Sequence, residues 1–364
     1  MFQDVVSDIV SMNSDSRQGS RHGSRRGSKD YGEAEIKSSF KDGEQDISTF
    51  RILCISSLYF HLGFATHPLR VSILPVEMER MFPEHSSLAI TVFIWAWAIG
   101  GIASSNVATY SDICLSKWGR RRPFIALGVL IQFVGTVGMW WSSHIDGGSM
   151  YLISNFVASY GFGMIYSIVF ALLNDQLSIH QLGYGGGWIS GVNLLGAVFG
   201  FLFILVFIKS NFTWFYVLLT FLPVPLLLLY LFVPETPLRA IPADHENHSV
   251  YSKAWRVLFN PEERDFLRTI LLQVCQHAES ALTPFKLLFV RDMMNVHDVQ
   301  TQNQLVGWNA ITIAAVAIPV ALAVGQFCDN GDMMWRQKFC IYLWSDTKFI
   351  VQFKFQIILK IKHN

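Results

Sequence analysis

The sequence has few charged residues. They make up 15% of its 364 positions, whereas an ordinary soluble protein carries about 25%. Positive and negative charges nearly cancel to a net charge of +1, so the basic excess of a nucleic-acid-binding protein is missing. The five cysteines are too few for a disulfide scaffold in a chain of this length. These shortages argue against a nucleic-acid partner and against a disulfide-stabilised fold.

Apolar residues, in contrast, are abundant and grouped. They make up 51% of the chain and include 29 phenylalanines, which excludes a disordered chain. A helix needs roughly 20 mostly apolar residues to cross a bilayer core of about 30 Å. Eight buried helices of a soluble protein would leave too few polar residues to cover its surface, so we predict an all-α membrane protein. The predicted spans are 52–74, 87–109, 123–142, 150–173, 187–208, 212–233, 268–290 and 304–327.

Lysine and arginine are distributed unevenly between alternate loops. The amino-terminal tail and the loops at 110–122, 174–186 and 234–267 contain 15 of them, whereas the opposite set of loops contains four. Because cytoplasmic loops carry the excess of positive charge, the sequence predicts an integral, multi-pass protein with a cytoplasmic N-terminus. A plasma membrane and a vacuolar or vesicular membrane both agree with this pattern.

The spans divide the chain into five segments. After residue 335 each apolar run is interrupted by Lys or Asp. This favours a terminus that is not the natural end of the fold over a short ninth span followed by a tail. The expected segments are a disordered, Ser/Arg-rich cytoplasmic tail (1–50), an N-terminal six-helix bundle (51–233), a cytoplasmic linker (234–267), the first helices of a C-terminal bundle (268–335) and an atypical tail (336–364).

The clearest motif lies between the second and third predicted spans. Asp112 precedes a turn at Gly119 and a cluster formed by Arg120, Arg121 and Arg122. An acid at a helix end can pair with arginines across such a turn, and ion pairs near a low-dielectric boundary are stronger than in water. Such a pair can hold two helices together in one conformation and release them in another. Anchoring to anionic lipid, worth about 1 kcal/mol per arginine, is the simpler alternative.

The whole stretch, S-D-x-C-x-S-x-x-G-R-R-R-P-F-I, resembles the loop motif of the major facilitator superfamily. Its form is similar to that of the sucrose:proton symporters and their animal relatives, in the glycoside–pentoside–hexuronide:cation branch. The A-L-L-N-D sequence ending at Asp175 resembles this family's A-L-L-x-D. The G-Q-F-C-D sequence ending at Asp329 resembles the start of the same loop motif in the second half. The resemblance implies two six-helix bundles, alternating access around a central site, and gating roles for these acids.

Two positions depart from this resemblance. It implies a proton-binding acid near the middle of the fourth helix and a sugar-binding arginine shortly before the A-L-L-x-D block. Ser159 and Phe170 stand at those positions. Proton binding and sugar binding therefore need other residues.

Ionisable residues inside predicted spans are costly in lipid and by default indicate function. His61 and His67 in the first span are candidates to carry a coupling proton, since imidazole titrates near physiological pH. Glu279 and Lys286 in the seventh span lie on one polar face, two turns apart. We expect this face to line water, a solute or a partner helix. For the two histidines the alternative is a hydrogen bond to a neighbouring backbone group or a place at the membrane interface. For Glu279 and Lys286 it is a static contact between helices.

Planar amides and aromatic rings bind sugars, and the spans offer Gln132, Asn193, Trp95, Trp97 and Asn309 for this role. For the two tryptophans the alternative is a place in the aromatic belt at the membrane interface. The sequence contains no Gly-Lys-Ser/Thr nucleotide-binding signature, so an ATP-driven pump is not expected. The cysteines are isolated, so we expect no metal site and no other cofactor. Regularly spaced small residues in the fifth span predict close helix packing: Gly187, Gly191, Gly196 and Gly200.

The leading hypothesis from the sequence is a secondary active transporter. It would carry a sugar such as sucrose, or a related small polar solute, together with a proton. The alternative is a truncated or degenerate relative that keeps the fold but does not transport. We expect no enzymatic activity, because no set of nucleophile and base is visible. The expected partners are therefore the solute, the coupling proton and the lipid bilayer.

Overall fold

The computed structural model describes residues 46–112, 114–178, 181–207, 213–219, 221, 223–235, 283–296 and 298–330. Within these ranges every regular element is a helix, as predicted for an all-α protein. Several predicted segments lie wholly or largely outside the described residues: the tail 1–50 up to residue 45, the linker 234–267 from residue 236, the seventh span up to residue 282 and the tail 336–364.

The first predicted span is a helical path with a break in its middle. It consists of α3 (Thr49–Pro68), the π-helix η1 (Leu69–Ile73) and α4 (Leu74–Met81). Pro68 has no backbone N–H to donate, and the chain widens into a π turn directly after it. The path runs past the predicted end at residue 74. Pro75 does not stop it, because Pro75 lies in the first turn of α4, where a missing N–H costs nothing.

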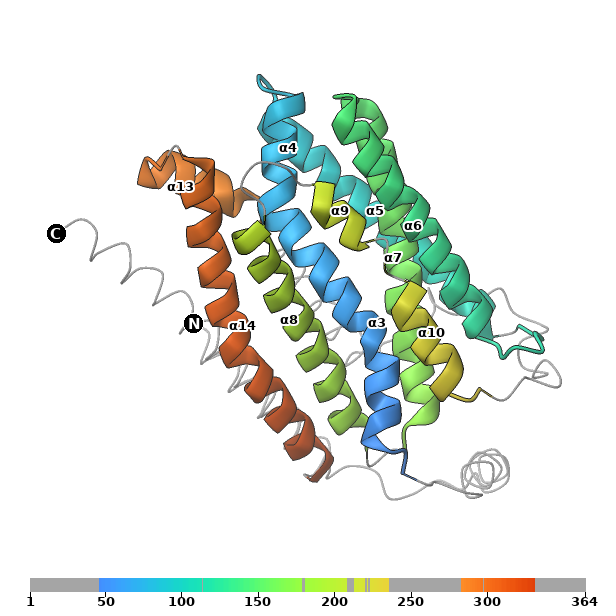
Figure 1. Cartoon of the computed structure of the whole chain (residues 1–364). Coiled ribbons are helices and arrows are strands. Elements are labelled where there is room, and N and C mark those ends of the chain that lie inside the picture. The colour runs from blue at the N-terminus through green and yellow to red at the C-terminus, as the bar shows by residue number, and fades with distance from the viewer. Residues whose placement is uncertain are drawn as a thin grey trace, which may run out of the picture. The chain divides into compact units, whose positions relative to one another are not determined.

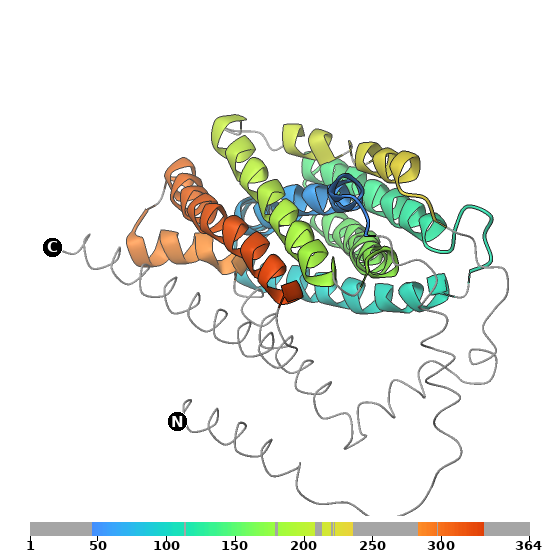
Figure 2. The same cartoon turned by 90° about the horizontal axis from the view of Figure 1, so that it is seen from below.

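The next four predicted spans are single helices, each a few residues longer than predicted at one or both ends. They are α5 (Ser86–Asp112), α6 (Arg122–His144), α7 (Gly148–Gln176) and α8 (Leu182–Phe207). α7 packs along both α5 and α6 (Figures 1 and 2). The buried side chains of α3 join this group through a cluster that includes Ile55, Leu58, Ile165 and Ile168.

The sixth predicted span, 212–233, is interrupted. It contains α9 (Thr213–Leu219) and α10 (Pro223–Phe232). The second piece begins at Pro223, and a proline ring is accommodated in the first turn of a helix but not in its interior. The sequence therefore predicted the place of this span correctly and missed its break. Together the two pieces are long and apolar enough to cross a membrane.

Three further elements follow residues 236–282, the long undescribed segment of the chain. They are the short 3-10 helix η5 (Thr283–Phe285), α13 (Lys286–Met294) and α14 (Val299–Asn330), and α14 contains the predicted span 304–327. Asp298 precedes α14 and accepts a hydrogen bond from the Thr301 backbone N–H at 2.9 Å. The hydrogen bonds from the Thr301 side chain and backbone lower the pKa of Asp298. This is the arrangement of a helix N-cap.

Glycines allow α8 to pack tightly against two helices, α3 and α14 (Figure 1). A Cβ atom on Gly187 would lie 2.8 Å from the carbonyl oxygen of Ala321 in α14. Gly196 and Gly200 face α3 in the same way, against the carbonyl oxygens of Phe60 and Phe64. The close packing predicted from the glycine spacing is therefore confirmed, and one stripe serves two partners.

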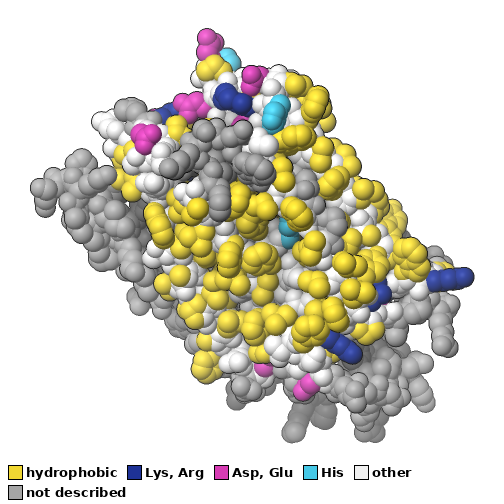
Figure 3. Space-filling model, viewed as in Figure 1, with side chains coloured by type: hydrophobic (Ala, Val, Ile, Leu, Met, Phe, Trp, Pro, Cys, Tyr) yellow, Lys and Arg dark blue, Asp and Glu magenta, His cyan; other side chains and the backbone are white. Residues whose placement is uncertain are grey.

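The outer surface of the bundle is apolar. Large side chains such as Ile102 of α5 and Ile153 of α7 are 73% and 66% exposed, and hydrophobic side chains cover the middle of the face in Figure 3. In the described residues, seven helical paths are long and apolar enough to cross a membrane. The eighth predicted span, 268–290, lies mostly outside those residues. Exposed apolar helices of this length are typical of an integral membrane protein.

The helix contact at Gly63 of α3 generates the first testable prediction. A Cβ atom there would overlap the Asn193 carbonyl of α8, so Gly63→Ala must push the two helices apart. We expect a loss of about 1–3 kcal/mol, typical of overpacking, and a lower melting temperature of the purified protein in detergent. Gly101→Ala is the matched control, because nothing lies within 4 Å of the added atom. Equal melting temperatures for the two variants would contradict the packing described.

Candidate functional site

Arg121 is the centre of a charge cluster where α5 ends and α6 begins; we call this end of the helices the arginine end. Its side chain is 6% exposed and pairs with Asp112 at 2.8 Å. Its Nε donates a hydrogen bond to Asp175 at the end of α7, and Arg120 pairs with the same carboxylate at 2.7 Å. Burial alone would lower the pKa of Arg121, but the hydrogen bond to Asp175 and the nearby carboxylates raise it on balance. The structure thus brings Arg120 and Arg121 together with Asp112 and Asp175. The Arg122 guanidinium lies apart from them, 5.3 Å from the ring centre of Tyr230.

Glu235, which follows α10, completes this cluster and was missed in the sequence. Its carboxylate accepts hydrogen bonds from the backbone N–H groups of Arg120, Arg121 and Arg122 at 3.1, 2.9 and 3.3 Å. These donors belong to the N-terminus of α6, where a negative charge is stabilised. Gly119 has φ of 99°, and a Cβ atom there would overlap the Glu235 carboxylate. Glycine is therefore required at position 119 for both reasons.

Asp329 makes a second contact at the arginine end. One of its oxygens accepts the backbone N–H of Gly183 at 2.7 Å and the other accepts that of Tyr184 at 2.6 Å. The carboxylate of α14 thus caps the N-terminus of α8. It joins a helix after the undescribed segment to a helix before it.

At the opposite end, which we call the α4 end, another ion pair joins helices from the two sides of the undescribed segment. Arg291 of α13 binds Glu79 of α4 at 2.6 Å. The two side chains are 26% and 48% exposed. In the described part of the chain, each end of the helices therefore has a charged contact between the earlier and the later part of the sequence.

The polar residues predicted for a solute site meet in part beside the break in α3. Asn193 of α8 donates to the Tyr59 carbonyl at 3.1 Å, and its oxygen lies 3.4 Å from Nε2 of His67. Asn193 can bridge these two turns of α3 because Gly63, between them, has no side chain. His67 is exposed although both of its chain neighbours are buried. The imidazole is therefore accessible, and the Asn193 side chain beside it is half-buried.

A cation and aromatic rings extend this polar group. The Arg70 guanidinium, in η1, lies 5.5 Å from the ring centre of Trp97 in α5. Trp97 in turn contacts Phe162 of α7, with ring centres 4.8 Å apart. Lys286, the first residue of α13, interacts electrostatically with His67. Lys286 and His67, both candidates for the solute or proton site, are thus near each other. The contact between Arg70 and Trp97 could not be predicted from the sequence.

Two predicted residues lie elsewhere. His61 is buried in α3, and its Nε2 has no hydrogen-bond partner among the described residues. Gln132 of α6 is buried at the contact with α7. The two helices approach so closely there that a Cβ atom on Gly161 of α7 would overlap the Gln132 backbone nitrogen. The sequence placed both residues in spans but gave no indication of which neighbour each one faces. Glu279 lies outside the described residues.

The two positions that depart from the sucrose symporter pattern are also placed. The Ser159 hydroxyl is buried in α7 and donates to the Asn155 carbonyl at 2.7 Å. Phe170, nearer the arginine end of α7, is 46% exposed. A serine bonded to its own helix and a phenyl ring supply neither a titratable acid nor a cation at these points.

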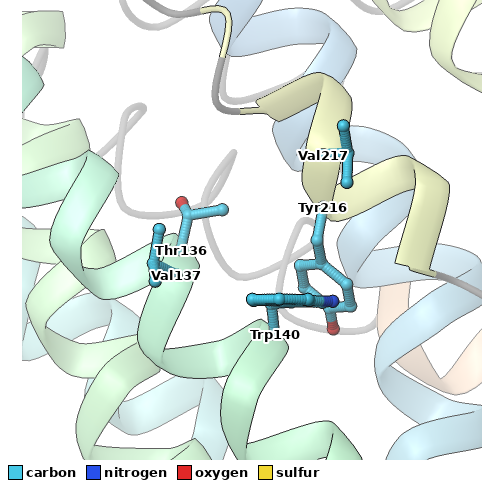
Figure 4. Close-up of a pocket in the computed structure, with 5 residues that line it drawn as sticks. All are labelled: Thr136, Val137, Trp140, Tyr216 and Val217. Carbon is cyan, nitrogen blue, oxygen red and sulfur yellow. The ribbon is translucent and has the colours of Figure 1, made fainter.

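A hollow of about 110 Å³ lies between α6 and α9 (Figure 4). This volume is well below the roughly 300–1,000 Å³ of typical small-molecule sites. None of the residues predicted for a solute or proton site lines it. The hollow is therefore a packing gap rather than the candidate site, and its lining consists of Thr136, Val137, Trp140, Tyr216 and Val217.

Comparison with known families now decides the class of the protein. The model of the Major Facilitator Superfamily matches residues 55–343, which is most of the chain and includes both motifs at the arginine end. The chain belongs to this superfamily. Its members are transporters and not enzymes, and the helical architecture with several candidate spans makes the protein an integral, multi-pass membrane protein.

Two curated proteins are similar to a part of this chain that is shorter than the superfamily match. They are the sucrose transport protein SUT1 of Oryza sativa subsp. japonica and that of Oryza sativa subsp. indica. Each is 34% identical over 79 residues, which cover 21% of this chain and 14% of the relative. The match therefore spans about one seventh of the length of these relatives, and it agrees with the resemblance found in the loop motif.

The Arg121 cluster generates a prediction about stability. Asp175→Asn removes one of the negative charges that surround the buried Arg121 side chain and leaves its ion pair with Asp112. We expect a loss of about 1–3 kcal/mol, measured as a lower melting temperature in detergent. Lys117→Gln, an exposed substitution in the same loop, serves as the control and should change little. An Asp175→Asn protein as stable as the control would show that the cluster does not tie α7 to α6.

Proposed function

We propose that the chain is a secondary active transporter that carries a sugar, sucrose-like in chemistry, together with a proton by alternating access. Membership of the superfamily supports the transport class, and the named relatives are sucrose transport proteins. The observation that carries the proposal is the group at the break in α3, where Asn193, His67 and the Arg70–Trp97 pair gather.

The chemistry of this group suits a sugar. An amide and an imidazole supply hydrogen-bond donors and acceptors to hydroxyl groups, and an indole face packs against the apolar face of a sugar ring. Polar side chains within membrane helices are placed where they line a cavity or meet a partner. The π-helix at Leu69–Ile73 supports the same location, since π turns occur frequently at functional sites.

Alternating access requires contacts that close one end at a time. Asp329 on the N-terminus of α8 is the candidate latch at the arginine end, with the Asp112–Arg121–Asp175 cluster beside it. Glu79 with Arg291 is the candidate latch at the α4 end. Each latch is a charged contact that can form in one conformation and break in the other, so its strength biases the populations of the two states.

We place the arginine end in the cytoplasm, because 15 lysines and arginines stand in that set of loops and four in the other. The exposed position 117 allows a check of this orientation. A Lys117→Cys side chain should react with a membrane-impermeant maleimide in inside-out vesicles only. Reaction in right-side-out vesicles would reverse the orientation.

Uptake of radiolabelled sucrose into proteoliposomes tests the proposed function. The purified chain should accumulate sucrose when the outside is more acidic than the inside, and should lose accumulation when a protonophore collapses the gradient. Asn193→Leu should raise KM about tenfold, because it removes the bridge between Tyr59 and His67 at a cost of about 1.4 kcal/mol.

Gln132→Leu is the matched control for Asn193→Leu. Both substitutions remove an amide from a membrane helix, but the Gln132 side chain of α6 is buried at the contact with α7. Its KM should stay near that of the unsubstituted protein. Background uptake by the unsubstituted chain in every gradient would contradict the transport proposal, and equal KM values for the two variants would contradict the site.

A further inference from the structure

Among the described residues, Glu77 is the acidic residue that is buried. It lies in α4, four residues after η1 ends, and the residue is 3% exposed. The other described acids that form ion pairs are far more accessible, with side-chain exposures from 29% for Asp175 to 70% for Asp146. A carboxylate withdrawn from water in this way is costly unless a cation accompanies it.

In the described part of the chain, Arg80 is the cation that pairs with the Glu77 carboxylate, and it also contacts Ser143 and Asp146. Arg80 Nη2 lies 2.6 Å from Glu77 Oε2, 2.7 Å from the Ser143 carbonyl oxygen and 3.5 Å from Asp146. The Ser143 hydroxyl donates to the same Glu77 oxygen at 3.1 Å. The Arg80 side chain is 47% exposed. Arg80 therefore stands between a buried acid in α4 and an exposed acid in the turn between α6 and α7.

The other elements packed around Glu77 bring polar but uncharged groups toward it. Tyr151 of α7 and Tyr216 of α9 are buried and hydrogen-bonded to each other at 2.9 Å, and both interact electrostatically with Glu77 and Arg80. The nearby charges on other faces have their own contacts: Glu79 with Arg291, and Arg70 with the Trp97 ring. Among the described residues, Arg80 and Asp146 are thus the charged groups that act on Glu77.

We propose that Glu77 is the group that binds the transported proton. When Arg80 pairs with Glu77, the carboxylate is charged, and the contacts of both residues with Ser143 hold α4 to the end of α6. When Arg80 moves to Asp146, an unpaired charge would remain buried, so Glu77 takes up a proton from the aqueous side and becomes a neutral carboxylic acid. After the change of conformation, the return of Arg80 displaces the proton, which leaves to water on the opposite side of the membrane. The inference rests on the proposed function, and it fills the role left empty by Ser159.

The position of Glu77 couples this proton to the rest of the protein. α4 follows the break at η1, which carries Arg70, and the same helix carries Glu79 of the contact with α13. A shift of Arg80 from Glu77 and Ser143 to Asp146 therefore changes the constraint on both the candidate solute site and the latch at the α4 end. Binding of a proton and closure of that latch become linked through one short helix.

Transport by Glu77→Gln separates a coupling role from a structural one. A glutamine keeps the shape and hydrogen bonding of the acid but does not titrate. In proteoliposomes we expect Glu77→Gln to lose proton-driven accumulation of radiolabelled sucrose by about tenfold or more while it still exchanges sucrose at equal concentrations across the membrane. The exchange should no longer depend on pH. The exposed Glu84→Gln in the loop after α4 is the control and should retain both activities. Sucrose accumulation by Glu77→Gln with the pH dependence of the unsubstituted protein would overturn the proposal.

A second measurement needs no solute and covers a variant that folds poorly. On acidification, infrared difference spectra of the unsubstituted protein should gain the carbonyl band of a buried carboxylic acid. Glu77→Gln should lack this band, and so should Glu77→Gln combined with Arg80→Gln, which leaves no unpaired cation. The same band in either variant would overturn the proposal. An unsubstituted protein that shows the band but carries no sucrose would contradict the proposed function and leave the proton site supported.

Discussion

The close contact of α3 with α8 determines where the polar chemistry of this protein lies. Lipid tails are as apolar as leucine, so helices in a membrane associate through backbone approach and hydrogen bonds rather than through the hydrophobic effect. Gly63 permits that approach, and Asn193 then reaches Tyr59 on one side and His67 on the other. The π-helix begins directly after Pro68, so the contact lies beside the irregular turn of the first span.

The ion pairs described above lie at the two ends of the helices, where they join segments distant in sequence. At the arginine end Arg121 connects α5, α6 and α7, while Asp329 connects α14 to α8. At the α4 end Arg291 connects α13 to α4. Contacts of this kind suit alternating access, because an ion pair near a low-dielectric boundary is strong when formed and its partners are readily hydrated when it opens.

The sequence predicted what depends on local pattern and missed what depends on distant partners. Apolar length located every described span, and the glycine spacing predicted the tight packing of α8. Asp112 and Arg121 could be paired because they flank one turn. Glu235 could not be predicted, since its partners precede it by more than 100 residues. His61 and Gln132 are in spans as predicted, but helical periodicity gives the face of a residue and not the helix that covers it.

Alkylation at position 193 tests the central claim most directly, namely that Asn193 faces a water-filled opening occupied by the solute. The chain would carry Asn193→Cys after replacement of its five natural cysteines. We predict that a water-soluble maleimide modifies this cysteine in the folded protein and that saturating sucrose slows the reaction. A cysteine that never reacts, or one that reacts at a rate independent of sucrose, would contradict it.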